Sequence, residues 1–343
     1  MRIVLDGMGS DTCPEPELVA VLEARQKFGD EVILVGPEDQ LRPRLQALAG
    51  DNPPVKLVHA PEVITMEDKG LALALKAKRK GSKTSLAVGI DLVKNGEADA
   101  FVTAGNTGGA MATAYYRLGP IAGLERPGLA GLFPVQGGDC VVLDIGANPD
   151  CKPEHLVQFA VMGAVYAQSL LRIQSPRVGL LSNGEEPGKG NELVRATYPL
   201  LAASGLNFIG NVEGKELYGG AADVVVMDGF TGNILLKSSE AVAKLITDTI
   251  SSEIKASKSL RTKLGGLLVK PALKGALMKK LDPAEVGAAR LLGVNGLVLI
   301  GHGRSDSRAL VSAIRMAREA VQANLMDNLR ASIQAHLSKS QDQ

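Results

Sequence analysis

Tryptophan is absent from this chain of 343 residues, and aromatic side chains make up only 3% of it. Proteins that bind single-stranded nucleic acids stack the bases on aromatic side chains, so we expect no nucleic acid among the partners. The core must be built from leucine, valine, isoleucine and alanine. Such a core favours helices packed on a sheet over an aromatic-rich β-sandwich.

Cysteine is also scarce. Cys13, Cys140 and Cys151 form no CxxC pair, so their spacing predicts neither a zinc site nor a disulfide framework and suits a reducing compartment. No apolar run reaches the length of about 18 residues that a membrane-spanning helix needs. The first residues predict a strand and not a signal peptide. We therefore expect a cytoplasmic protein.

Two nucleotide-binding motifs are missing. The dinucleotide fingerprint GxGxxG does not follow the first predicted strand, where DGMGSD (6–11) carries carboxylates that would repel a pyrophosphate. The stretch NGEEPGKG departs from the Walker motif, because Asn183 replaces its first glycine and Gly190 its serine or threonine. The four histidines are scattered. We predict neither a cofactor nor a metal.

What the sequence does contain is a regular alternation of short β-branched runs with longer amphipathic runs, which is typical of parallel strands joined by crossover helices. We predict one α/β/α domain of three layers with a mostly parallel sheet over residues 1–343. Strands are expected at 2–6, 31–35, 55–59, 99–103, 140–144, 177–182, 207–212, 222–228 and 296–300. Helices are expected at 15–28, 84–95, 107–117, 153–171, 189–203, 231–254 and 307–335.

Small, polar, glycine-rich segments follow seven of these strands. They span 6–11, 103–109, 144–150, 182–190, 211–214, 228–233 and 301–306. Open α/β folds bind ligands at the carboxyl ends of their parallel strands. We therefore expect the seven segments to line one cleft.

The segment TAGNTGG (103–109) predicts an anion site. Gly105, Asn106, Thr107 and Gly108 would present backbone N–H groups at the start of a helix, where the helix dipole favours negative charge. A tight turn without a ligand is the alternative.

Three further positions also have a functional and a structural interpretation. Lys189 is either a charge partner for an anion or part of a solvated cluster with Glu185 and Glu186. His302, between two glycines, either faces the cleft or stabilises a turn. The aspartates that end strands, among them Asp6 and Asp228, more often cap helices than bind metal.

Residues 255–281 contain eight basic side chains and no acidic one. We predict a basic amphipathic helix pair over 255–282, divided by Gly265-Gly266 and Pro271. It would contact an anionic membrane surface, dock an acidic partner, or cover the core as a solvated hairpin. The apolar side chains expected at a membrane are Leu260, Leu264, Leu267, Leu268, Leu273, Leu277, Met278 and Leu281.

Ordered blocks along nearly the whole chain carry a family resemblance. They include DGMGSD, FVTAGNTGGAM, VLDIGANPDCKPEHL, GLLSNGEEPGKGN, VVVMDGFTGNILLK and LVLIGHG. The chain resembles the PlsX family of bacterial phosphate acyltransferases, which convert fatty acyl-ACP and inorganic phosphate into acyl phosphate and free ACP for phospholipid synthesis. The resemblance implies a fold similar to isocitrate and isopropylmalate dehydrogenases and to phosphate acetyltransferases, a homodimer, and peripheral membrane association.

Three blocks depart from the family pattern. The first loop usually reads DAMGGD, so Gly7 and Ser10 differ here. A late block usually reads GGAPLLG, whereas this chain has Arg290 before Leu291. Two serines commonly follow the histidine and glycine of the last loop, and here Arg304 precedes Ser305.

Phosphate is a competent nucleophile, so the expected chemistry needs positioning beside the thioester and stabilisation of the oxyanion, with no covalent enzyme intermediate. We expect Lys189, Asn106, Asn233 and His302 to be catalytic. Other side chains expected in the cleft are Asp6, Asn148, Asn183, Glu185, Asp228, Thr231 and Lys237. An acyl-CoA donor, a non-catalytic membrane scaffold and a decarboxylating dehydrogenase remain alternatives.

Overall fold

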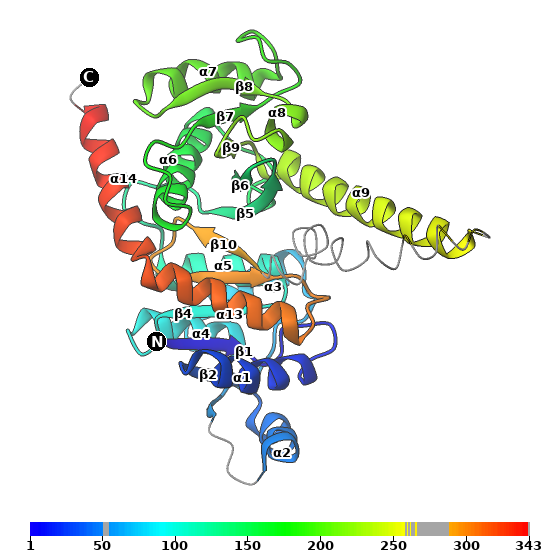
Figure 1. The fold of residues 1–343 in the computed structure, drawn as a ribbon. Helices are drawn as coiled ribbons and strands as arrows, with labels where there is room; N and C mark the ends of the chain where they lie inside the picture. The colour runs from blue at the N-terminus through cyan, green and yellow to red at the C-terminus, as the bar shows by residue number, and fades with distance from the viewer. Residues whose placement is uncertain (51–54, 258, 260, 262–264, 266–287, 342–343) are drawn as a thin grey trace.

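The computed structural model describes residues 1–50, 55–257, 259, 261, 265 and 288–341 (Figure 1). The eight apolar side chains from Leu260 to Leu281, expected at a membrane, lie outside the described residues, as does most of the predicted basic helix pair.

The described strands form one sheet of eleven, in the order β3-β2-β1-β4-β11-β10-β5-β6-β9-β7-β8. The first five of these are β3 (Lys56–His59), β2 (Glu31–Gly36), β1 (Arg2–Asp6), β4 (Ala100–Thr103) and β11 (Val298–Gly301). They are all parallel to one another. The last four, β6 (Gly138–Leu143), β9 (Val224–Val226), β7 (Val178–Leu181) and β8 (Phe208–Val212), form a second parallel group.

Two antiparallel strands, β10 (Ala288–Leu292) and β5 (Gly128–Val135), separate the two groups. β10 is antiparallel to β11 and β5, and β5 is antiparallel to β6. These three reversals make the two parallel groups run in opposite directions. The prediction that all seven loops leave one parallel edge is therefore wrong, because three of them follow the first group and four follow the second.

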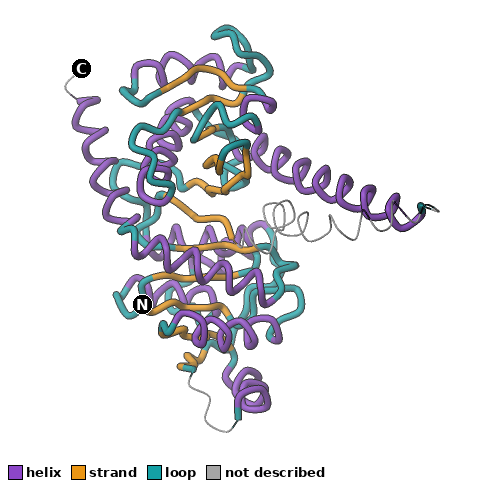
Figure 2. Tube along the Cα trace, viewed as in Figure 1, coloured by secondary structure: helices purple, strands orange, loops and turns teal. Residues whose placement is uncertain are grey.

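Helices cover both faces of the sheet (Figure 2). Alternate residues of β1 separate the two layers, because Ile3 and Leu5 pack in one buried cluster and Val4 packs in the other. The first cluster includes residues of α1 (Glu15–Phe28), α6 (Pro153–Leu170), α7 (Glu192–Ala203), α13 (Ser307–Gln322) and α14 (Leu325–Gln341). The second includes residues of α4 (Ser85–Lys94), α5 (Thr107–Leu118) and α8 (Gly214–Tyr218).

The helices agree with the sequence pattern where capping residues mark their ends. The helix predicted at 189–203 begins at Glu192, because the Asn191 side chain accepts a hydrogen bond from the N–H of Val194. The helix predicted at 307–335 is two helices, since Asn324 has a left-handed backbone (φ 51°) between α13 and α14. Within the described ranges, three helices were not predicted: α2 (Glu38–Ala49), α3 (Gly70–Lys78) and α8.

Helix α9 (Gly229–Ala256) projects away from the rest of the described chain (Figure 1). Its first turns pack on the second buried cluster through Leu235 and Leu236. Beyond them it exposes Val242, Leu245 and Ile246. No helix within the described ranges is long and apolar enough to cross a membrane.

Candidate active site

The loops after β1 and β4 are joined beneath the candidate phosphate site. The Thr103 hydroxyl donates to Asp6 Oδ2 at 2.8 Å, and the Gly105 N–H donates to Thr103 Oγ1 at 2.9 Å. A Cβ on Gly9 would lie 2.9 Å from the Ala104 nitrogen, so only glycine lets the loops approach this closely. Burial raises the pKa of Asp6, although the Thr103 hydroxyl favours the ionised carboxylate.

The start of α5 is organised by Asn106. Its Oδ1 accepts the Gly109 N–H at 2.9 Å, and its Nδ2 donates to the carbonyls of Thr65 and Asp68 at 2.9 and 3.0 Å. Both the oxygen and the nitrogen of the Asn106 side-chain amide therefore already have hydrogen-bond partners within the protein. The N–H groups of Thr107 and Gly108 lie in the first turn, where a helix supplies no acceptor, and both residues are exposed.

The loop after β11 reaches the second half of the molecule through His302. Its Nε2 lies 3.1 Å from Nζ of Lys237 on α9, and the Gly303 carbonyl accepts the Asp11 N–H at 2.7 Å. Burial and then the Lys237 ammonium lower the pKa of His302, so a neutral imidazole is favoured. Helix α9 therefore brings together loops that the opposed parallel groups would otherwise separate.

Beneath the start of α9 lies a carboxylate that receives five hydrogen bonds. Asp144 Oδ1 accepts the N–H groups of Leu129, Gly146 and Ala147, and Oδ2 accepts from the backbone and side-chain nitrogens of Asn148. Burial raises the Asp144 pKa against these bonds. The Asn148 side-chain nitrogen also donates to the Pro127 carbonyl at 2.7 Å, so both of its N–H groups are bonded within the protein.

Helix α9 packs directly on this loop. A Cβ on Gly232 would lie 1.9 Å from the Asp144 carbonyl oxygen. Asp228 caps the helix by accepting hydrogen bonds from the backbone and hydroxyl of Thr231, both at 2.8 Å. Asn233, one position past Gly232, is exposed. Of the predicted residues here, Asp228 and Thr231 are thus used as a cap.

The loop after β7 is closed by Asn183, whose Oδ1 accepts the Gly190 N–H at 3.0 Å. Asn211 on β8 holds the same loop from below, because its Nδ2 donates to the Glu186 carbonyl at 2.8 Å. Lys189 lies on this loop with its side chain exposed.

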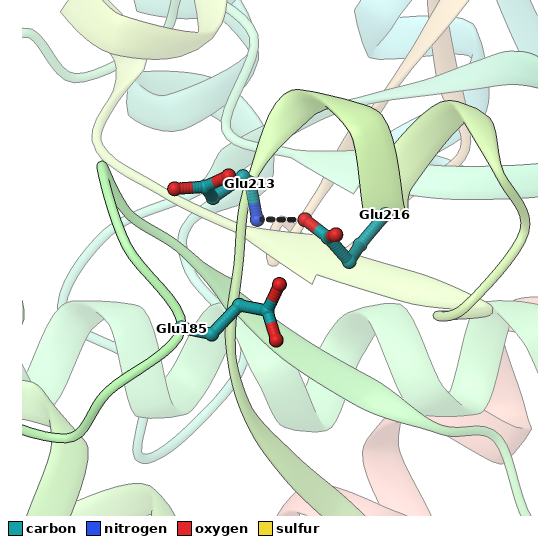
Figure 3. Close-up of side chains that lie close together, drawn as sticks. All are labelled: Glu185, Glu213 and Glu216. Atoms are coloured by element: carbon teal, nitrogen blue, oxygen red, sulfur yellow. Dashed lines mark hydrogen bonds between the residues drawn. The ribbon is translucent and has the colours of Figure 1, made fainter.

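Three carboxylates come close together near this loop: Glu185, Glu213 and Glu216 (Figure 3). The Lys215 ammonium lies 3.1 Å from Glu185, 3.8 Å from Glu213 and 3.1 Å from Glu216. Glu185, predicted in the cleft, is therefore part of an ion-pair cluster. Lys215 offsets one of the three negative charges, and we assign no metal to the cluster.

A second buried acid lies below the first loop. Glu17 on α1 is fully buried; its Oε1 accepts the Ser10 N–H at 2.8 Å, and its Oε2 has no partner among the described residues. Burial raises the pKa of Glu17 to about 7, against the Ser10 hydrogen bond. No pattern in the sequence singles out this acid, because a glutamate on an amphipathic helix is usually solvated.

Other partners of the site were also missed. No role was predicted for the Thr65–Asp68 segment, in which the carbonyls of Thr65 and Asp68 accept the hydrogen bonds of the Asn106 amide nitrogen. Lys215 was not singled out, although the stretch EGKE (213–216) places it between two of the glutamates that it pairs with. Contacts between loops this far apart in the chain leave no spacing pattern in the sequence.

Solved structures with a similar fold are distant in sequence. A phosphotransacetylase from Staphylococcus aureus matches with a TM-score of 0.58 at 16% identity, covering 94% of each chain. One from Streptococcus pyogenes gives 0.59 at 18% identity, again covering 94% of each chain. A 4-hydroxythreonine-4-phosphate dehydrogenase from Klebsiella pneumoniae gives 0.54 at 15% identity, over 94% of this chain and 99% of that one. These matches show an α/β fold with a large, mostly parallel mixed sheet.

Similarity in sequence is much closer to proteins named phosphate acyltransferase. The protein from Pelotomaculum thermopropionicum is 47% identical over 98% of this chain and 96% of its own length. That from Acidobacterium capsulatum is 46% identical over 97% of both. The family model described as "Fatty acid synthesis protein" matches residues 1–328. The chain therefore belongs to this family, the PlsX-type phosphate acyltransferases.

Proposed function

We propose that the chain transfers a fatty acyl group from acyl-ACP to inorganic phosphate. The observation that carries the proposal is the 43–47% identity to phosphate acyltransferases over nearly the full length. A phosphate oxygen attacks the thioester carbonyl carbon, the C–S bond breaks, and the pantetheine thiolate leaves and takes a proton. The products are acyl phosphate and free ACP, which would supply phospholipid synthesis.

Phosphate would bind at the start of α5. The backbone N–H groups of Asn106, Thr107 and Gly108 supply donors and the positive end of the helix dipole, and Thr107 and Gly108 are exposed. Gly105 would contact the phosphate beside them, although its own N–H donates to Thr103 Oγ1. Asn106 acts here by positioning, because its amide holds both the first turn and the Thr65–Asp68 segment.

The oxyanion and the phosphate charge need cationic or N–H partners from the opposite side of the cleft. Lys189 is exposed on the loop after β7, and Lys237 lies beside His302 at the junction of the two halves. Asn233 offers an exposed amide on the first turns of α9. We assign Lys189 to the phosphate or oxyanion charge, and Asn233 and His302 to hydrogen bonding. Asp6, Asn148 and Asn183 support the loops.

Direct attack by phosphate, without an acyl-enzyme, agrees with the protonation of Cys13 and Cys151. Burial raises the pKa of Cys13 to about 11 and that of Cys151 to about 12. Both thiols stay protonated at neutral pH, and a thiol is a much weaker nucleophile than a thiolate. Neither of these cysteines, which lie next to the loops of the site, is poised to form an acyl-enzyme.

Exposed apolar residues on helix α9 support peripheral membrane association, while the proposed homodimer rests on the family resemblance alone. Along it, Phe230, Ile234, Val242, Leu245, Ile246 and Ile250 are at least 39% exposed. The basic segment 255–281 continues the chain from this helix. Apolar side chains beside a run of lysines suit an anionic membrane surface. We expect the full chain to co-sediment with anionic vesicles, and its Leu245→Glu variant to do so less; equal co-sedimentation would contradict this role for α9.

The proposed relation to isocitrate and isopropylmalate dehydrogenases concerns the fold alone. It rests on the family resemblance of the sequence, and the eleven-stranded sheet with helices on both faces is compatible with it.

The decisive experiment incubates the purified chain with palmitoyl-ACP and phosphate, measures the free ACP thiol and traps acyl phosphate with hydroxylamine. We expect phosphate-dependent formation of both products. Palmitoyl-CoA in a parallel reaction distinguishes an ACP from a CoA donor, and product from neither thioester would overturn the proposal.

The same assay tests the assigned residues. We expect Lys189→Ala and Asn106→Ala each to lower turnover at least tenfold, about 1.4 kcal/mol of lost transition-state stabilisation. Arg42→Ala, on the exposed face of α2, is the matched control. Turnover near that of the unchanged chain in both variants would contradict the assignment.

A further inference from the structure

A cavity of about 230 Å³ lies away from the loops of the active site, where the last turns of α6 and α13 meet strands β5 and β10. Leu132, Leu170, Leu171 and Ala323 form its apolar walls. Arg172 and Gln322, both exposed, line it on the solvent side. The cavity is thus open to a small molecule and amphipathic in its lining.

Arg290 lines this cavity as a buried cation. Its side chain lies on β10, is only 2% exposed, and forms no ion pair within the described ranges. Nη1 donates to the Tyr166 hydroxyl and Nη2 to the Met316 carbonyl at 3.1 Å, so two of five N–H groups reach neutral oxygens. Nε has no hydrogen-bond partner there. A buried charge without a counter-charge is costly, and an anion would offset that cost.

The other charged groups around the cavity do not supply that anion. Glu319 lines it as well, but its Oε1 is 2.9 Å from Nη1 of Arg315 on the same helix. Arg172 adds a second positive charge on the solvent side. The lining therefore carries two arginines and one glutamate, and its net charge is positive.

We propose that this cavity binds a small organic anion that has a carboxylate head and a short apolar tail. The carboxylate would accept from the Nη–H groups of Arg290 that the Tyr166 hydroxyl and the Met316 carbonyl leave unused, one on each Nη. At about 30 Å³ for each water-sized group, the cavity holds about eight non-hydrogen atoms, the size of hexanoate. Arg290 stands where the family block usually has proline, so the site would belong to this chain and not to the family as a whole.

The test measures binding of hexanoate to the full chain by calorimetry and by thermal unfolding. We expect hexanoate to bind and to raise the unfolding temperature. Arg290→Met should weaken binding at least tenfold, and so should Ala323→Phe, which fills the cavity and leaves Arg290 in place. Arg42→Met, an exposed arginine on α2, is the control and should bind as the unchanged chain does.

The stability of the unliganded variants separates a ligand site from a structural arginine. Arg290→Met removes an unpaired buried charge, so without anions we expect it to unfold no earlier than the unchanged chain. Hexanoate binding that persists in both cavity variants would place the ligand elsewhere, for example in the acyl site, and overturn the proposal. Equal stabilisation by phosphate and hexanoate, lost together in Arg290→Met, would contradict the apolar tail. If Arg290→Met fails to fold, Ala323→Phe decides alone.

Discussion

The starts of α5 and α9 share one pattern of capping hydrogen bond and differ in the charge of the cap. Each begins after a strand of the sheet, and each is capped by a side-chain oxygen that accepts an N–H three residues on: Asn106 from Gly109 at 2.9 Å, and Asp228 from Thr231 at 2.8 Å. The cap of α5 is a neutral amide, while that of α9 is a carboxylate. The negative charge of Asp228 already interacts with the positive end of the α9 dipole. Of these two helices, α5 is therefore the one whose first turn can attract an external anion.

The two starts also differ in packing. Gly232 and Gly229 of α9 lie against the backbone of the Asp144–Asn148 loop, with no room for a Cβ. At Gly108 of α5 a Cβ would meet its nearest atom, of Leu73, at 3.4 Å, an ordinary contact. A helix start packed on backbone is rigid and buried. One left open to solvent can take a ligand.

The largest predicted effect breaks the packing of α9. Gly232→Ala places a Cβ 1.9 Å from the Asp144 carbonyl oxygen, so the helix must move away from the loop. We expect a loss of about 4 kcal/mol or more in the free energy of unfolding, or failure to fold. Gly108→Ala should change stability by less than about 1 kcal/mol. Denaturant unfolding followed by circular dichroism measures both, and equal stabilities would contradict the comparison.

The next effect concerns the acids beneath the two starts. Asp144 below α9 receives five hydrogen bonds, whereas Glu17, near Asp6 on the α5 side, receives one and has a pKa raised to about 7 from 4.5. The folded state therefore holds a proton more tightly than the unfolded state. Protonated Glu17 therefore adds to the free energy of unfolding. This contribution is complete below about pH 4.5 and is lost as pH rises through 7, a change of about 3 kcal/mol.

Glu17→Gln should remove this share of the pH dependence. We expect the loss of unfolding free energy between pH 5 and 8 to be smaller in Glu17→Gln than in the unchanged chain. Glu15→Gln, on the same helix but exposed and paired with Arg44, is the matched control and should keep the full dependence. A pH dependence that is identical in all three proteins would show that Glu17 is not the acid responsible.

The smallest effects are expected from substitutions that add a charge at the start of α5 or remove one at the start of α9. Thr107→Asp adds a carboxylate to the first turn of α5, so we expect the KM for phosphate to rise about tenfold, or 1.4 kcal/mol, with no loss of stability. Thr107→Ser is its control. Asp228→Asn keeps a good cap on α9 and should change the free energy of unfolding by less than about 1 kcal/mol. A KM unchanged by Thr107→Asp would mean that phosphate binds elsewhere.

Local pattern predicted most elements of the fold. Helix α1 has the predicted bounds, 15–28, because proline at its start and the left-handed Gly29 at its end mark them in the sequence. The strands that were missed, β5 and β10, are the two antiparallel ones. β5 reads GLAGLFPV and β10 reads AARLL, and neither run has the β-branched composition of a buried strand. Their omission also hid the reversal of direction between the two parallel groups.

Prediction of the candidate site was limited in a different way. Polar residues at strand ends could be found, but their partners could not. Asn106 and Asn148 were expected to contact substrate, and the structure shows both amides bonded to backbone groups, in one case to carbonyls about forty residues earlier. Whether a polar side chain is free for a ligand depends on such long-range contacts.

The sequence by itself determined the family, the alternation of strands and helices, and the polar loops at strand ends, because these depend on residues that are near one another in the chain. Tertiary structure alone decided which loops meet, which amides and acids are already bonded, and that Arg290 lies buried beside a cavity. The physical reason is that burial and hydrogen bonding are set by neighbours in space. In this fold a mixed sheet brings those neighbours together. The antiparallel pairing of β10 and β5 that reverses the strand direction cannot be read from a short stretch of sequence.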